Sequence, residues 1–124
     1  MKKALLAVLG ISFLLEAGLA LGGFVARDRL ITQFGLAVTD DTRFLGSVLA
    51  WMLLFTTMIC GIAFAETRRG TAAGRKLDYA LGFWWIGIGL SLAIGYGRLE
   101  HLVLDALKGA LIVGLTWSTS RARG

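Results

Sequence analysis

The sequence predicts an all-α integral membrane protein: a four-helix bundle with antiparallel, up-and-down topology and both termini in the cytoplasm. The chain has 124 residues, of which only 17% are charged, and a mean hydropathy of +0.73. It is therefore too apolar for an ordinary small soluble domain. It contains four apolar stretches, each close to the about 20 residues that a helix needs to cross a bilayer. No stretch alternates apolar and polar residues as barrel strands do, so helices are the only spanning structure left.

The four spans are expected at about residues 4–25, 44–65, 79–96 and 99–118. The first span stays apolar beyond Glu16, so we expect an uncleaved helix rather than a signal peptide. We find no internal repeat and no second domain, so residues 1–124 are expected to form one transmembrane domain.

Two features predict how the last spans pack. The turn at residues 95–98 is very short, so the third and fourth helices should be antiparallel neighbours. Gly87, Ser91 and Gly95 recur at four-residue spacing in the third span. Small residues at this spacing favour close helix contact in membranes.

The distribution of basic residues sets the expected orientation, because cytoplasmic loops are richer in lysine and arginine than outer loops. Eight such residues lie on one side and four on the other, which places both termini in the cytoplasm. The eight are Lys2, Lys3, Arg68, Arg69, Arg75, Lys76, Arg121 and Arg123, and the four are Arg27, Arg29, Arg43 and Arg98.

The first outer loop, residues 26–43, is the longest connection between spans. It offsets its arginines with several aspartates and contains Leu30, Ile31 and Phe34. These three side chains predict a short amphipathic segment lying on the membrane surface.

The fourth span carries a polar stripe. His101, Asp105 and Lys108 recur at i, i+4 and i+7, which places them within roughly 60° on one helix face. A charged side chain in mid-membrane costs roughly 2.5–3.5 kcal/mol on insertion scales, so it normally faces protein, water or a partner charge. We therefore take the stripe as a candidate ligand-binding site.

Glu16 lies at a depth similar to that of Lys108. At 1.5 Å per residue, Glu16 is about 18 Å and Lys108 about 15 Å from the inner ends of their helices. The sequence thus predicts a buried acid–base cluster of Glu16, Asp105 and Lys108, with His101 one turn nearer the outer surface. Two further candidates to line the same cavity are Ser12, one turn before Glu16, and Thr56, at mid-depth in the second span.

A purely structural interpretation of this cluster stays open. Buried acid–base pairs can simply fix which helix meets which. Asp105 and Lys108 at i, i+3 can satisfy each other without a ligand. A threonine such as Thr56 commonly bonds a carbonyl of its own helix.

The sequence lacks the motifs of several classes of protein function. The single His101 and single Cys60 provide no metal-ligand set and no haem ligation, so neither metal nor cofactor is predicted. Residues 70–74 lack the Lys-Ser/Thr ending of a phosphate-binding loop. The basic residues flank apolar stretches, which makes them topology signals rather than a nucleic-acid surface. No catalytic residues are predicted, although an isomerase using carboxylates and a lysine stays open.

Two family resemblances add to this. Phe34-Gly35-Leu36 after the first span and Arg43-Phe44-Leu45-Gly46 at the second resemble the DoxX-like small four-helix membrane proteins of bacteria. That resemblance implies a multi-pass protein of the bacterial inner membrane, sometimes an accessory to oxidative or catabolic systems. Glu16, after Leu14-Leu15, is similar to the essential glutamate of small multidrug resistance transporters. Those transporters carry no His–Asp–Lys stripe on the fourth helix.

The sequence therefore favours a small non-enzymatic membrane component, a binding or accessory subunit. Its expected partners are the lipid bilayer and either a small amphipathic ligand or a partner helix, held at the acid–base cluster. A homo-oligomer or a larger membrane complex stays open. The alternative is a proton-coupled small-molecule transporter that acts as a homodimer, with Glu16 as its exchange site.

Cysteine labelling checks the orientation. In a Cys60→Ser background, cysteines introduced beside Arg68 and Arg121 should be shielded from an impermeant external thiol reagent, because the basic bias places both in the cytoplasm. The variant Thr39→Cys should react. Labelling beside Arg68 from outside the cell would reverse the orientation.

Overall fold

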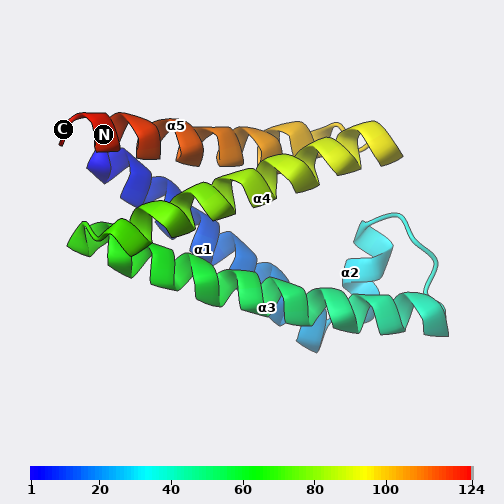
Figure 1. Cartoon of the computed structure of the whole chain (residues 1–124). Helices are drawn as coiled ribbons and strands as arrows, with labels where there is room; N and C mark the ends of the chain where they lie inside the picture. The colour runs from blue at the N-terminus through cyan, green and yellow to red at the C-terminus, as the bar shows by residue number, and fades with distance from the viewer. Residues whose placement is uncertain (124) are drawn as a thin grey trace. The chain divides into compact units, whose positions relative to one another are not determined.

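A computed structural model describes residues 1–123 of the protein, and all the regular secondary structure in that range is helical, with no strand (Figure 1). Its elements in order are α1 (Lys2–Val25), α2 (Arg27–Gln33), α3 (Asp40–Arg69), α4 (Ala72–Tyr96), the π-helical η1 (Leu102–Leu107) and α5 (Lys108–Arg121).

Four helices are long and apolar enough to cross a membrane: α1, α3, α4 and the continuous stretch Leu102–Arg121. The all-α class and the four expected apolar helices are therefore confirmed. The side of the membrane on which each terminus lies stays a prediction, as does the up-and-down arrangement of all four helices.

The chain forms two compact units. The first consists of Met1–Gly10 and the chain from Cys60 onward, and the second consists of Ile11–Ile59. The first unit contains the end of α3 and all of α4, η1 and α5. The second contains most of α1, α2 and the larger part of α3.

In the first unit, α4 packs backbone against backbone on the stretch formed by η1 and α5. A Cβ built on Gly82 would lie 2.9 Å from the carbonyl oxygen of Gly109. One built on Gly89 would lie 2.7 Å from the carbonyl oxygen of His101. The helices approach this closely because glycine presents no side chain at either point. The buried face of α4 consists of Gly74, Asp78, Leu81, Gly82, Trp85, Gly89 and Ala93.

This contact face is not the expected one. Gly87, Ser91 and Gly95 are exposed, and a Cβ on Gly87 or Gly95 would meet nothing within 4 Å. The buried face instead places Trp85, 2% exposed, between the contact glycines. Burying a large aromatic side chain between two close backbone contacts excludes more apolar surface than a stripe of small residues would.

The expected short turn after the third span is confirmed. Gly97 takes the left-handed conformation (φ +67°), and its N–H donates to the carbonyl of Leu92. The N–H of Arg98 donates to the same carbonyl at 3.1 Å. Glycine at this C-terminal position ends the helix without a Cβ clash. The chain reverses at once, so α4 and α5 are antiparallel neighbours (Figure 1).

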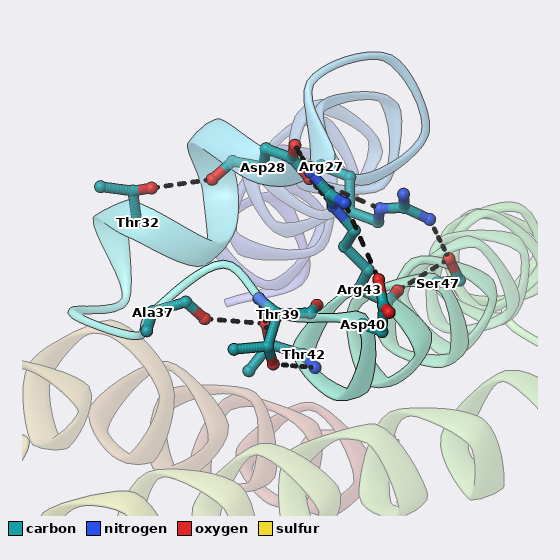
Figure 2. Close-up of polar contacts among 9 residues, drawn as sticks. All are labelled: Arg27, Asp28, Thr32, Ala37, Thr39, Asp40, Thr42, Arg43 and Ser47. Atoms are coloured by element: carbon teal, nitrogen blue, oxygen red, sulfur yellow. Dashed lines mark hydrogen bonds and ion pairs between the residues drawn. The ribbon is translucent and has the colours of Figure 1, made fainter.

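In the second unit, α3 begins with a reciprocal cap (Figure 2). The Thr39 hydroxyl accepts from the Thr42 N–H at 3.2 Å, and the Thr42 hydroxyl accepts from the Thr39 N–H at 2.8 Å. This satisfies N–H groups that the first helical turn would otherwise leave without partners. Asp40 and Asp41 in the first turn complement the helix dipole.

The short helix α2 occupies the loop where an amphipathic segment was expected. Its Ile31 is buried, and a Cβ on Gly46 of α3 would lie 3.4 Å from Ile31 Cδ1. Leu30 and Phe34 are half-buried. Ile31 thus packs on protein, and the expected membrane-surface face of this segment is in part a helix contact.

An ion pair and a hydrogen bond hold α2 against α3 (Figure 2). Arg43 donates to both carboxylate oxygens of Asp28, from Nε at 3.2 Å and from Nη2 at 2.9 Å. Arg27 Nη1 donates to Ser47 Oγ at 2.8 Å. The hydrogen bond from Arg43 holds the pKa of Asp28 below its usual range. Because the pKa of Asp28 is lower in the folded than in the unfolded protein, its ionised form stabilises the fold at pH values above the unfolded-state pKa. This stabilisation is lost as the pH falls through the folded-state pKa.

A matched pair of substitutions tests the packing of α4. Gly82→Leu should destabilise the protein in detergent by at least about 1–3 kcal/mol, because the added side chain meets the backbone of α5. Gly87→Leu adds the same atoms in open space and should leave the unfolding midpoint almost unchanged. Unfolding in denaturing detergent, followed by helical circular dichroism, measures both. Equal effects would mean that Gly82 does not lie at the helix contact.

Candidate functional site

Three polar side chains of the predicted stripe meet in the first unit. Nδ1 of His101 lies 2.6 Å from Oδ2 of Asp105. Nζ of Lys108 lies 3.6 Å from Oδ1 of the same carboxylate. Asp105 therefore stands between a histidine ring and an ammonium group, and uses one oxygen for each. We call these residues the His101–Asp105–Lys108 cluster.

The cluster is largely withdrawn from solvent and rests on α4. The side chains of His101, Asp105 and Lys108 are 14%, 15% and 11% exposed. Nζ of Lys108 also lies 4.1 Å from the ring centroid of Trp85. An ammonium over an indole face is attracted by the electrons of the ring, and more strongly when water is excluded. Lys108 thus has an anionic partner on its own helix and an aromatic partner on α4.

Asp105 belongs to the π-helical segment η1, Leu102–Leu107. Such segments are rare, and within longer helices they occur mostly as single turns, often at functional sites. Here the segment packs on Gly89 of α4, where an added Cβ would overlap the backbone at His101 and Ala106. The wide turn and the close helix contact therefore coincide at the level of the cluster.

The geometry limits the chemistry that the cluster can perform. In the tautomer that carries its proton on Nδ1, His101 donates that N–H to the Asp105 carboxylate. Lys108 supplies a positive charge, and the Trp85 ring supplies an apolar wall. A charged carboxylate held between a histidine ring and an ammonium group can bind a polar group or pass a proton.

The other predicted site residues lie in the second unit. Glu16 is 5% exposed and Ser12 is completely buried. The Ser12 hydroxyl has no hydrogen-bond partner within residues 1–123. Thr56, 8% exposed, donates to the carbonyl of Met52 at 2.9 Å, the local bond expected for a helical threonine. The structure thus brings His101, Asp105 and Lys108 together, while the pairing of Glu16 with Lys108 stays a prediction.

A second buried carboxylate, Asp78 of α4, was not anticipated from the sequence. It is completely buried, and its Oδ2 accepts a 2.7 Å hydrogen bond from the hydroxyl of Thr67. Its Oδ1 has no hydrogen-bond partner in the part of the chain that the structure describes. The signal was present in the sequence, because Asp78 shares a helix face with Leu81 and Trp85 and so is directed toward the protein.

Similarity to known proteins gives no information about the site. No family model, no curated protein and no solved structure matches the chain. Within residues 1–123, no group of three or more His, Cys, Asp or Glu side chains is placed to hold a metal ion.

Removing Asp105 tests whether the cluster is coupled. Asp105→Asn leaves Lys108 without its carboxylate, and breaking a buried ion pair in this way costs up to about 3–5 kcal/mol. Adding Lys108→Met should recover part of that loss, because the ammonium group that lost the Asp105 carboxylate is then absent. Unfolding in denaturing detergent measures the cycle, with Asp40→Asn at a fully exposed site as the control. Strictly additive losses would show that the two residues are not coupled.

Proposed function

We propose that this chain is a small, non-enzymatic, multi-pass protein of the bacterial inner membrane, a binding or accessory subunit. It holds the polar head of a small amphipathic ligand, or a polar group of a partner helix, at the His101–Asp105–Lys108 cluster. The apolar part of the ligand lies along the helices. Both termini face the cytoplasm.

One observation carries the proposal: three ionisable side chains gather within an apolar helix, each between 11% and 15% exposed. Charged groups inside membrane spans are costly, and by default they mark a pathway or a binding site. The remaining exposure leaves an edge of the cluster accessible. Helix pairing alone would be served equally well by apolar residues of similar volume.

The chemistry of the cluster indicates the type of ligand. Lys108 carries an ammonium group with N–H donors, and His101 carries a ring that forms hydrogen bonds, as its contact with Asp105 shows. Trp85 provides an aromatic face beside the ammonium group. A ligand with an anionic or hydrogen-bond-accepting head and an apolar tail fits this combination.

A proton-coupled transporter, working as a homodimer, is the second candidate. The observation that favours it is the carboxylate of Glu16, 5% exposed in the middle of α1, one turn from the fully buried Ser12. A buried acid within a span is the usual element of a proton relay. Transport would require Glu16 to gain and lose a proton during each cycle.

Quenching of Trp85 fluorescence distinguishes the two functions. In a protein with Trp51, Trp84 and Trp117 changed to phenylalanine, a carboxylate amphiphile with a brominated chain should quench Trp85 saturably. Lys108→Leu should abolish saturation, because the head loses its charge partner. A brominated alcohol of equal chain length is the control and should quench only in proportion to its concentration in the detergent.

Proton flux in proteoliposomes tests the transporter directly. An accessory subunit should give no flux above that of empty vesicles, with or without Glu16→Gln. Flux driven by an added amphiphile and lost in Glu16→Gln would support the transporter and overturn the binding role. Quenching by acid and alcohol alike would remove the cluster as the site.

A further inference from the structure

The unanticipated carboxylate of Asp78 lines a cavity at one end of the first unit. The cavity has a volume of about 20 Å³ and is lined by parts of α1, α3, α4 and α5 and by the turn between α3 and α4. A cavity needs a volume of roughly 10–15 Å³ to hold one water-sized group. The space therefore admits one small polar group and not a whole ligand.

Some polar groups around the cavity have hydrogen-bond partners within the described chain, and one does not. The hydroxyl of Thr116, 1% exposed, donates to the carbonyl of Ile112 at 2.6 Å. The hydroxyl of Thr67 donates to Asp78 Oδ2. Asp78 Oδ1 accepts no hydrogen bond within residues 1–123, although its residue is completely buried. A buried carboxylate oxygen without a donor is costly, so a group that brings N–H or O–H donors is favoured here.

The rim of the cavity has the opposite charge. Lys2, Arg75 and Arg123 line it. Lys2 Nζ donates to the carbonyl of Arg68 at 2.8 Å, and Arg123 Nη1 donates to the carbonyl of Gly70 at 3.1 Å. These bonds hold two cationic groups in place and leave further N–H donors on each. An occupant therefore needs a positive, donating end inside and a negative group outside.

The position of the cavity near the start of α4 is compatible with contact to a lipid headgroup. α4 has 25 residues, which is about 37 Å at 1.5 Å per residue, longer than the about 30 Å hydrocarbon core. Asp78 is in the second turn of α4, close to the end where the chain enters the headgroup layer. Basic side chains at this level attract lipid phosphates.

From this arrangement we infer that the cavity is a headgroup site for phosphatidylethanolamine. The ammonium group, about the size of one water molecule, donates to Asp78 Oδ1, and the phosphate lies among Lys2, Arg75 and Arg123. Phosphatidylcholine binds more weakly because its trimethylammonium is larger and has no N–H. Phosphatidylglycerol offers no positive charge to the carboxylate. The inference requires only that the apolar helices cross a bilayer, so failure of the proposed binding at His101–Asp105–Lys108 would not affect it.

Thermal unfolding in detergent, with added short-chain phospholipid, tests the site. Phosphatidylethanolamine should stabilise the protein at a concentration about tenfold lower than phosphatidylcholine, the ratio expected for one hydrogen bond to a charged group. The monomethyl and dimethyl headgroups should fall in between. Asp78→Asn should reduce the ratio to about one, and Asp40→Asn, a fully exposed aspartate, should leave it unchanged.

Each alternative occupant gives a different result. Equal effects of ethanolamine and choline lipids on the wild type would mean that the cavity holds only water, and this arm does not depend on Asp78→Asn folding. Equal effects of phosphatidylglycerol and phosphatidylethanolamine would mean recognition of phosphate alone. Stabilisation by soluble phosphoethanolamine at the same concentration would assign the site to a small metabolite instead of a lipid. Any of these outcomes overturns the inference.

Discussion

The lack of water inside a bilayer is the main constraint on apolar helices of this kind, because a polar group there is costly unless it has a partner. The hydroxyls of Thr57 and Thr119 donate to carbonyls one turn earlier on their own helices, at 2.7 Å in each case. The Cys60 thiol instead bonds to a different helix, and its Sγ lies 3.4 Å from the carbonyl oxygen of Leu9. Side chains too strongly polar for such local bonds collect instead into the His101–Asp105–Lys108 cluster and around Asp78. The binding sites that we propose follow from this constraint.

The packing of α4 against η1 and α5 sets the geometry of the cluster. Gly82 meets the carbonyl of Gly109, and Gly89 meets the carbonyl of His101, so the two helices have one preferred register. That register places Trp85 beneath Lys108. A shift by one residue would turn Trp85 off the shared face by about 100°. The same glycines therefore determine both the stability of the hairpin and the position of the charged groups.

The sequence predicted the parts of this protein that depend on residue type and spacing. Hydropathy located the four apolar helices, and the short glycine turn at Gly97 predicted the antiparallel α4–α5 pair. The i, i+4, i+7 spacing placed His101, Asp105 and Lys108 together. Residue type and spacing did not predict the π-helical turn, which lies where η1 packs closely on Gly89 of α4. The contact face of α4 was wrong, since spacing alone does not show which stripe also buries Trp85.

Asp78 was missed because its position next to the basic loop resembles that of an ordinary interfacial charge. The spacing to Leu81 and Trp85 indicated the buried face, and in the structure α4 begins at Ala72, so that this face continues past the apolar span to Asp78. Asp78 and Asp105, both in the first unit, differ in how their carboxylate oxygens are paired. Asp105 has a histidine on one oxygen and an ammonium group on the other, an arrangement complete enough to be structural as well as functional. Asp78 has one hydroxyl on one oxygen and, in the described chain, no hydrogen bond on the other. An incompletely paired carboxylate beside a water-sized cavity is energetically suited to an external donor, so Asp78 provides the stronger geometric argument for a ligand.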